Sequence, residues 1–195
     1  MKKLLLCVML CTFMMTLATS AQAQRRGSAA KASYIGLEAG LFLPSESDLD
    51  SGFDVGAKFI HYFNENIGVN GILSYRSFGG EYDGYLSKVE LDITTISLAG
   101  GVSGRYPLNN TFYLVGDAGI AYHMNTAKLT MKLFGHTVSE DDDENKIGFY
   151  LNGGANFHVT PDVSVGGLIR YTINDAYDDF DLGGISILLT LGYMF

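Results

Sequence analysis

The segment GHTVSEDD, residues 135–142, holds the residue types that nucleophilic catalysis uses. His136, Ser139 and Glu140 could act as base, nucleophile and orienting acid if their side chains came within hydrogen-bonding reach of one another. All three fall in a long acidic stretch between two runs of alternating polarity, and nothing in their spacing fixes such a geometry. We therefore expect no catalytic residues and no enzyme activity in this chain.

The other histidines and the acidic runs supply no better site. His61, His123 and His158 stand far apart near strand ends, and four scattered histidines make no metal-ligand cluster. The run DDDEN, residues 141–145, lacks the glycine and the ligand spacing of a calcium-binding loop. Carboxylates at an acidic rim could still hold divalent cations, but a run of charge is more often a solvated loop. We expect no cofactor and no dedicated metal site.

Five charged residues lie in runs whose other members are largely glycine or small polar residues: Glu38, Lys58, Arg105, Asp117 and Arg170. Because they alternate with apolar residues, they should all point to the same, sparsely filled face of a sheet. If that face lines a closed interior, the charges must pair, since an isolated buried charge costs several kcal/mol. We expect Glu38 or Asp117 to pair with Arg105 or Lys58, and Arg76 to lie nearer the outer rim.

The elements that would position these residues are strands. Eight runs alternate with a period of two, and no stretch shows the 3.6-residue apolar stripe of an amphipathic helix. The runs are 34–43, 53–62, 67–77, 91–106, 111–123, 146–158, 163–173 and 183–195. In the fifth run, Phe112, Leu114 and Ile120 share one face, while Asp117 and His123 share the other. Each run therefore has one apolar face and one face of glycine and polar groups.

The connections between the runs alternate in length. Residues 63–66, 107–110 and 159–162 carry turn residues and are short. The longer connections, with their strand edges, hold all but four of the twenty-one acidic residues, and they span 44–51, 79–90, 125–145 and 174–181. This rhythm predicts an all-β, antiparallel up-and-down barrel with turns at one end and loops at the other. Residues 127–135 alternate again, so the fifth and sixth strands could instead extend as a protruding hairpin.

Aromatic residues mark both ends of the apolar stripes. At the turn end they are Tyr106, Phe112, Phe157 and Phe195, and at the loop end they are Tyr75, Tyr122, Phe149 and Tyr171. Two aromatic girdles around an aliphatic band suit the two interfaces of a membrane. A soluble sandwich or lipocalin-like barrel would bury such aromatics in its core, so the repeated two-girdle pattern favours a transmembrane barrel over those folds.

The first 23 residues have the composition of a secretory signal peptide. Two lysines precede an apolar run that is too short to span a membrane comfortably, and AQA at 21–23 forms a small-x-small cleavage site. Cleavage would remove both cysteines and leave 11 basic against 21 acidic residues, a formal net charge of −10 that disfavours binding to nucleic acid. We expect a signal peptide at 1–23, a flexible segment at 24–33 and the barrel at 34–195.

The closing residues LTLGYMF place Leu189, Leu191, Tyr193 and Phe195 at alternate positions. With the signal peptide and the eight runs, this ending resembles the small outer-membrane β-barrel domains, similar to the OmpA and OmpX barrels and the porin-family barrels. The resemblance covers residues 34–195. It implies an eight-stranded antiparallel transmembrane β-barrel in the outer membrane of a Gram-negative bacterium, with both termini periplasmic. It also implies that these four residues are the sorting signal recognised by the barrel-assembly machinery.

The resemblance does not fix a function, because one fold serves many. It implies contact with outer-membrane lipid and lipopolysaccharide, and an eight-stranded interior is narrow enough for side chains to fill. We favour a non-catalytic barrel with a plugged polar lumen, whose acidic extracellular loops serve envelope structure or surface interaction and adhesion with an extracellular protein. The alternatives are a narrow, porin-like channel through the five charged residues and a lipid A-modifying enzyme using His136 and Ser139. Their spacing differs from the His-x-Ser arrangement of those enzymes.

Overall fold

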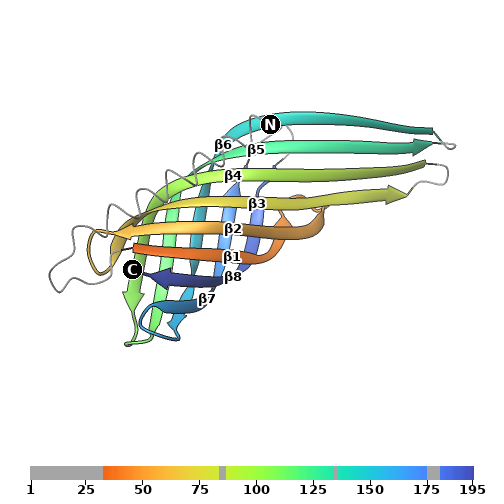
Figure 1. Ribbon diagram of the computed structural model, residues 1–195. Helices are drawn as coiled ribbons and strands as arrows, with labels where there is room; N and C mark the ends of the chain where they lie inside the picture. The colour runs from red at the N-terminus through yellow and green to blue at the C-terminus, as the bar shows by residue number, and fades with distance from the viewer. Residues whose placement is uncertain (1–32, 84–86, 134–135, 175–180) are drawn as a thin grey trace.

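A closed antiparallel barrel of eight strands forms from residues 33–83, 87–133, 136–174 and 181–195, the parts that the computed structural model describes (Figure 1). The strands are β1 (Ser33–Pro44), β2 (Asp50–Tyr62), β3 (Ile67–Asp83), β4 (Ser87–Pro107), β5 (Phe112–Leu133), β6 (His136–His158), β7 (Val163–Ile173) and β8 (Gly184–Met194). Each strand pairs with its neighbours in the chain, and β8 pairs with β1. The predicted fold class is confirmed.

The predicted signal peptide lies outside the described residues, as does all of the predicted flexible segment except Ser33, which opens β1. Their assignments stay predictions. Over the described ranges, we find no helix with the length and apolar character needed to cross a membrane.

The strands are apolar on the outside of the barrel and polar or small on the inside, the reverse of a soluble barrel. In β8, the outward side chains of Ile187, Leu189 and Leu191 are 52%, 76% and 54% exposed, whereas Ser186 and Thr190 point inward and are buried. Keeping aliphatic surface in water costs roughly 25 cal/mol per Å². The exterior is therefore suited to lipid, as in a membrane barrel.

The pairing of β8 with β1 closes the barrel. It runs from Tyr34 opposite Met194 to Pro44 opposite Gly184. Phe195 prolongs it, because its N–H donates to the carbonyl oxygen of Ser33 at 2.9 Å, and the Ser33 N–H donates to the carbonyl oxygen of Phe195 at 3.1 Å. Closure pairs the backbone groups that would otherwise be exposed at two sheet edges.

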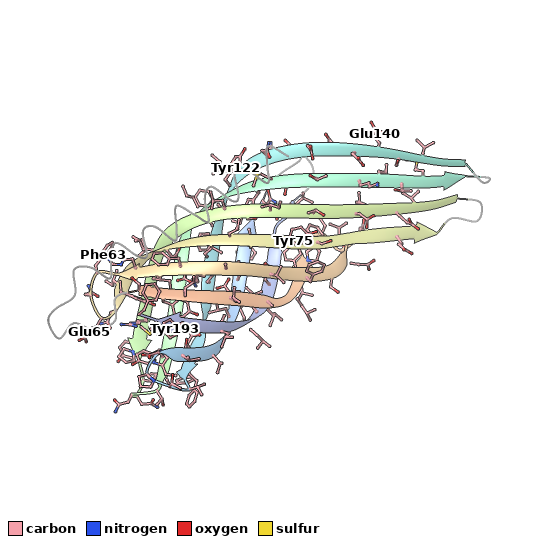
Figure 2. All side chains as sticks on the ribbon, viewed as in Figure 1. Phe63, Glu65, Tyr75, Tyr122, Glu140 and Tyr193 are labelled. Carbon is pink, nitrogen blue, oxygen red and sulfur yellow. The ribbon has the colours of Figure 1, made fainter. Side chains whose placement is uncertain are left out.

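Aromatic residues on the outer wall gather near its two rims. Figure 2 places Phe63 and Tyr193 near the short turns, and Tyr75 and Tyr122 farther along toward the other end. Most of the girdle residues expected from the sequence are exposed: Tyr75, Tyr106, Tyr122, Phe149, Phe157 and Tyr171. Phe112 and Phe195 are only partly exposed. The rings thus stand where the interfaces of a bilayer would meet the wall.

Two of the expected long loops are mostly strand, which corrects the prediction at these places. β3 continues to Asp83 and β4 begins at Ser87, where a loop over 79–90 was expected. β5 continues to Leu133 and β6 begins at His136, so the protruding hairpin replaces the loop over 125–145. The period-two alternation persists in residues 127–133, and a ladder satisfies backbone groups that a loop would leave to water.

Strands β3 to β6 run past the other four strands as one sheet (Figure 1). β2 pairs with β3 only as far as Gly79, and β7 pairs with β6 only as far as Phe149. Residues 78–83, 87–93, 127–133 and 136–142 lie side by side in register at the far end. We call these residues the projecting sheet.

Candidate functional site

Six charged side chains in the middle of the lumen contact one another in alternating sign. In order of contact they are Asp117, Lys58, Glu38, Arg170, Asp54 and Arg76. Each is 4% exposed or less. Three acids meet three bases, so the chain of contacts is formally neutral. Neutrality matters here because removal of one buried partner leaves a charge that neither water nor protein compensates.

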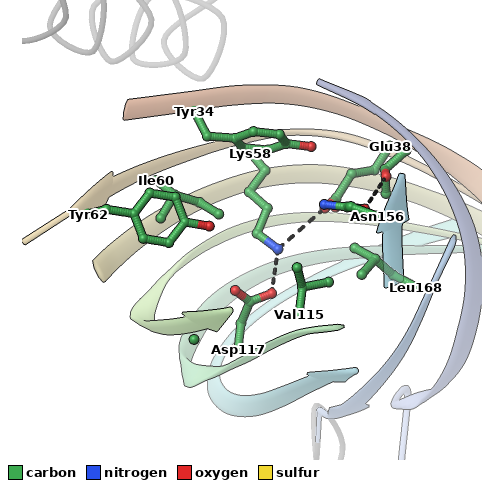
Figure 3. A pocket seen from close by; sticks show the side chains of 11 residues that line it. Tyr34, Glu38, Lys58, Ile60, Tyr62, Val115, Asp117, Asn156 and Leu168 are labelled. Carbon is green, nitrogen blue, oxygen red and sulfur yellow. Dashed lines mark hydrogen bonds and ion pairs between the residues drawn. The ribbon is translucent and has the colours of Figure 1, made fainter. Parts of the chain in front are cut away.

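Lys58 joins the first two carboxylates of this chain. Its ammonium contacts Asp117 directly and lies 3.8 Å from Oε1 of Glu38 (Figure 3). Asp117 also accepts hydrogen bonds from the Ser103 hydroxyl at 2.5 Å and from the Asn152 amide at 3.1 Å. Side chains from β2, β3, β4 and β6 therefore converge on the one carboxylate of β5, since the Asn70 amide also donates to it at 3.5 Å. Its charge is held by an ammonium and by neutral donors.

Arg170 carries the chain of contacts onward to Asp54. One nitrogen of its guanidinium contacts Glu38, and the other lies 3.6 Å from Oδ2 of Asp54. The same oxygen lies 3.5 Å from Nε of Arg76 and accepts a hydrogen bond from the Ser186 hydroxyl at 2.6 Å. The planar fork of donors on arginine allows one side chain to bridge two carboxylates in this way.

Apolar clusters lie toward both ends of the lumen, beyond the charges. Tyr34, Ile60, Tyr62 and Met194 pack together toward the short turns, and Phe42, Leu49, Phe78, Ile93 and Leu182 pack together toward the loops. Small cavities lie between the layers, including one of about 20 Å³ beside Lys58 and Asp117 and one of about 10 Å³ beside Arg76 and His123. Each of these two has room for about one water molecule.

Four of the five expected lumen residues come together, and Arg105 is a correction. Its guanidinium lies 4.1 Å from the ring centroid of Tyr62, and its Nε donates to the carbonyl oxygen of Glu65 at 2.5 Å. It therefore does not pair with Glu38 or Asp117. Arg105 stands close to the end of β4, where an aromatic face and a turn carbonyl are the partners within reach of its side chain.

Two members of the chain of charges were not among the five expected lumen residues. Asp54 was not singled out, and Arg76 was expected nearer the outer rim, where it lies beside Phe42 of the loop-end cluster. Both follow the inward alternation of their strands: Asp54 shares its face with Lys58 in β2, and Arg76 shares its face with Asn70 in β3. Strict parity, continued to the strand ends, would have added both residues to the expected lumen set.

The structure does not assemble the histidine–serine–acid set considered as a catalytic alternative. Ser139 and Glu140 are successive residues of β6, so their side chains project from opposite faces of the sheet. The side chain of His136 lies outside the described part of the structure. Among the residues that are described, no group of three or more histidine, aspartate or glutamate residues is placed to hold a metal ion.

The four residues of the closing motif lie along the outer wall. Leu189, Leu191 and Tyr193 are exposed, and Phe195 is partly exposed. The rings of Tyr193 and Phe195 stack with their centroids 6.3 Å apart. Leu189, Leu191 and Tyr193 follow the outward alternation of β8, and Phe195 comes directly after the end of this strand. Their role as an assembly signal stays a prediction.

The projecting sheet has two different faces. On the lumen side, Val89, Met131 and Val138 stand directly opposite one another on β4, β5 and β6, as do Leu91, Leu129 and Glu140 in the next inward-facing row. On the outer side, Asp92, Lys128 and Asp141 form such a row. The lumen side is therefore largely apolar with acidic residues on β6, whereas the outer side is polar.

A closed eight-stranded barrel with an aliphatic, aromatic-rimmed exterior and a charged interior defines the class of small transmembrane β-barrels. Residues 9–195 match the family model of the outer membrane protein beta-barrel domain, and the chain belongs to this family. A search of curated proteins finds no match.

Solved outer-membrane barrels share the fold. The outer membrane protein OprG of Pseudomonas aeruginosa is similar with a TM-score of 0.56 and 16% identity, over 86% of this chain and 98% of that one. Ail, the attachment invasion locus protein of Yersinia pestis, is similar with a TM-score of 0.55 and 20% identity, over 85% of this chain and all of that one. At identities this low, the similarity establishes a common fold and nothing about ligands.

Proposed function

We propose that this chain is a non-catalytic outer-membrane barrel with a plugged lumen, which presents its projecting sheet outside the cell as an interaction surface. The observation that carries the proposal is the filling of the interior: a neutral chain of six charges lies between two apolar clusters. The interior of an eight-stranded barrel is only wide enough for side chains to fill it. With the interior filled, the strand ends are the surface on which function can reside.

The orientation follows from the two ends of the barrel. Short turns at 63–66, 108–111 and 159–162 lie at one end, and the projecting sheet lies at the other. Membrane barrels keep short turns on the periplasmic side and long connections outside. We therefore place both termini in the periplasm, the outer wall against lipid and lipopolysaccharide, and Leu189, Leu191, Tyr193 and Phe195 as the signal for the barrel-assembly machinery.

A ligand of another barrel helps to define what this surface would bind. Ail has been solved in complex with the heparin analogue sucrose octasulfate, and that structure is similar to this chain with a TM-score of 0.52 and 19% identity. It supports the idea that a barrel of this fold can hold a ligand. A sulfated ligand would meet repulsion here, because the outward ends of β3 to β6 carry Glu81, Glu90, Asp92 and residues 140–144, all acidic.

Conductance across a planar bilayer tests the plugged lumen. The chain without its first 23 residues would be refolded into lipid, and its folded state checked by heat-dependent mobility on gels. We expect a folded protein that carries no current at neutral pH. Discrete, steady current steps would contradict the proposal and favour a porin-like channel lined by Glu38, Lys58, Asp117 and Arg170.

A shortened hairpin tests whether the projecting sheet is separate from the barrel's stability. Thr126 and Asp143 stand opposite each other, so residues 127–142 can be replaced by an Asn-Gly turn without changing the register below them. We expect this short-hairpin variant to refold and to remain non-conducting. A variant that no longer folds would show that the sheet serves the barrel rather than an external partner.

A further inference from the structure

We infer that the inner face of the projecting sheet is a docking site for a cationic amphipathic polypeptide segment. The inference rests on the proposed function, because it takes the projecting sheet to stand outside the membrane as an interaction surface. It adds the place on the sheet where the partner is seated and the chemistry that the partner carries.

The first observation is an apolar strip with no cover among the described residues. It consists of Val89, Leu91, Leu129, Met131 and Val138, which we call the inner strip. Met131 and Val138 are 43% and 67% exposed. Toward the barrel, the strip continues into the buried cluster at the loop end, since Leu91 packs against it. These side chains share the lumen side of the wall, so the lipid around the barrel does not reach them.

The second observation is a pair of acidic residues beside the inner strip. Glu140 and Asp142 follow Val138 on the same face of β6 and are exposed (Figure 2 labels Glu140). Neither forms an ion pair with any residue that the structure describes. The next acid on this face, Glu144, is already paired with Lys146 at 3.0 Å. Two negative charges therefore remain available at the side of an apolar surface.

The arrangement of these residues specifies the occupant. Apolar side chains come mainly from β4 and β5, and the carboxylates come from β6, so the face is divided lengthwise into an apolar half and an acidic half. A partner that fits must bury apolar side chains against the first half and bring positive charges to the second. A cationic amphipathic segment does both, whereas an acidic or purely polar segment would leave one half unmatched.

A synthetic peptide of alternating lysine and leucine, labelled with a fluorophore, is the probe for this site. Binding would be measured to the chain in nanodiscs of zwitterionic lipid, with empty nanodiscs as the reference for binding to lipid. We expect saturable binding that weakens as salt is raised, and much weaker binding of glutamate–leucine and lysine–serine peptides of equal length. Equal binding of the lysine–leucine and lysine–serine peptides would overturn the inference.

Paired substitutions on the two faces of β6 locate the site. Glu140→Gln with Asp142→Asn removes two charges from the inner face, and Asp141→Asn with Asp143→Asn removes two charges from the outer face of the same strand. We expect the inner pair to weaken binding about tenfold and the outer pair by less than about twofold. Equal losses would mean attraction by overall charge alone, which would overturn the inference.

The apolar half is tested by Met131→Ser with Val138→Ser, which should weaken binding about tenfold while the barrel still folds. If the short-hairpin variant loses binding but neither inner-face pair has an effect, the inference fails and the proposed function stands. If the lumen conducts, the proposed function fails by its own test. Copies carrying Val138→Cys could also form a disulfide with one another. If they do, and the lysine–leucine peptide does not prevent it, the inner strip binds a second copy of the chain and the inference is overturned.

Discussion

Asp54 and Arg76 stand directly opposite each other on β2 and β3, with Nε of Arg76 3.5 Å from Oδ2 of Asp54. Asp54 also lies 3.6 Å from Arg170, so it connects Arg76 to the other charged residues of the lumen. The Arg76 guanidinium in turn lies 5.0 Å from the ring centroid of Phe42. This cross-strand pair therefore joins the charged middle of the lumen to the apolar cluster at the loop end.

Removing Asp54 should be among the most damaging single changes in the barrel. Asp54→Ala leaves the guanidinium groups of Arg76 and Arg170 without this shared carboxylate in a buried site, and we expect the free energy of unfolding to fall by about 3–5 kcal/mol. Urea titration in lipid vesicles would measure it. Asp141→Ala, on an exposed outer face, is the control and should stay within about 0.5 kcal/mol of wild type. Equal effects of the two changes would contradict the lumen network.

A double-mutant cycle should separate the Lys58–Asp117 contact from its surroundings. Lys58→Met and Asp117→Leu each strand a buried charge and should each cost about 3–5 kcal/mol, whereas the double variant should cost clearly less than their sum. The same urea titration applies. Simple additivity would show that the two side chains act independently despite their contact.

The sequence was sufficient to predict the barrel because every strand run has one continuously apolar face and one face of small and polar residues. This is the pattern of a barrel with its apolar side outward, opposite to that of a soluble barrel. Ile187, Leu189 and Leu191 on one face of β8, against Ser186 and Thr190 on the other, indicate both the strand and its lipid-facing side. The same alternation was present in residues 127–133, but the density of acidic residues in 79–90 and 139–145 favoured loops. In a sheet that is exposed to water on both sides, charged residues can occupy either face. The sequence alone therefore could not distinguish a projecting sheet from a loop in these stretches.

The lumen contacts were harder to predict than the wall. Parity gives the inward direction of Glu38, Lys58, Asp117 and Arg170, but it does not give their height in the barrel. Height depends on the stagger between strands, which only the register of all eight pairs determines. Arg105 illustrates the difficulty: it faces inward, yet it lies too close to the turns to meet a carboxylate.

Two glycines of the barrel wall should respond oppositely to the same substitution. A Cβ on Gly192 would overlap the ring of Tyr34, whereas a Cβ on Gly153 would meet no atom within 4 Å. We expect Gly192→Ala to destabilise the barrel by about 1–3 kcal/mol through overpacking. We expect Gly153→Ala to be neutral or to stabilise by up to about 1 kcal/mol. Urea midpoints of the two variants decide between these values, and similar midpoints would argue against the tight packing of Tyr34.

Arginine on the outer wall should distinguish lipid-facing from water-facing positions. Leu189 lies in the middle of the outward row of β8, so Leu189→Arg should cost about 2–4 kcal/mol in a bilayer. Ser139 is exposed on the outer side of the projecting sheet, where Ser139→Arg should cost less than about 1 kcal/mol. Refolding yields and unfolding titrations in vesicles would measure both. A cost at Ser139 equal to that at Leu189 would place the projecting sheet inside the membrane.

The side chain of Phe195 should matter more for assembly in cells than for the stability of the finished barrel. Its pairing with Ser33 uses backbone groups alone, so Phe195→Ala keeps both hydrogen bonds and loses only a partly exposed ring. After refolding into vesicles, we expect a free energy of unfolding within about 1 kcal/mol of wild type. In cells, we expect a clear loss of heat-modifiable protein from outer membranes. Tyr106→Ala, which removes an exposed ring at the same end of the barrel, is the control and should assemble normally. Equal assembly of both variants would remove the ring of Phe195 from the assembly signal and leave the last strand with a purely structural role.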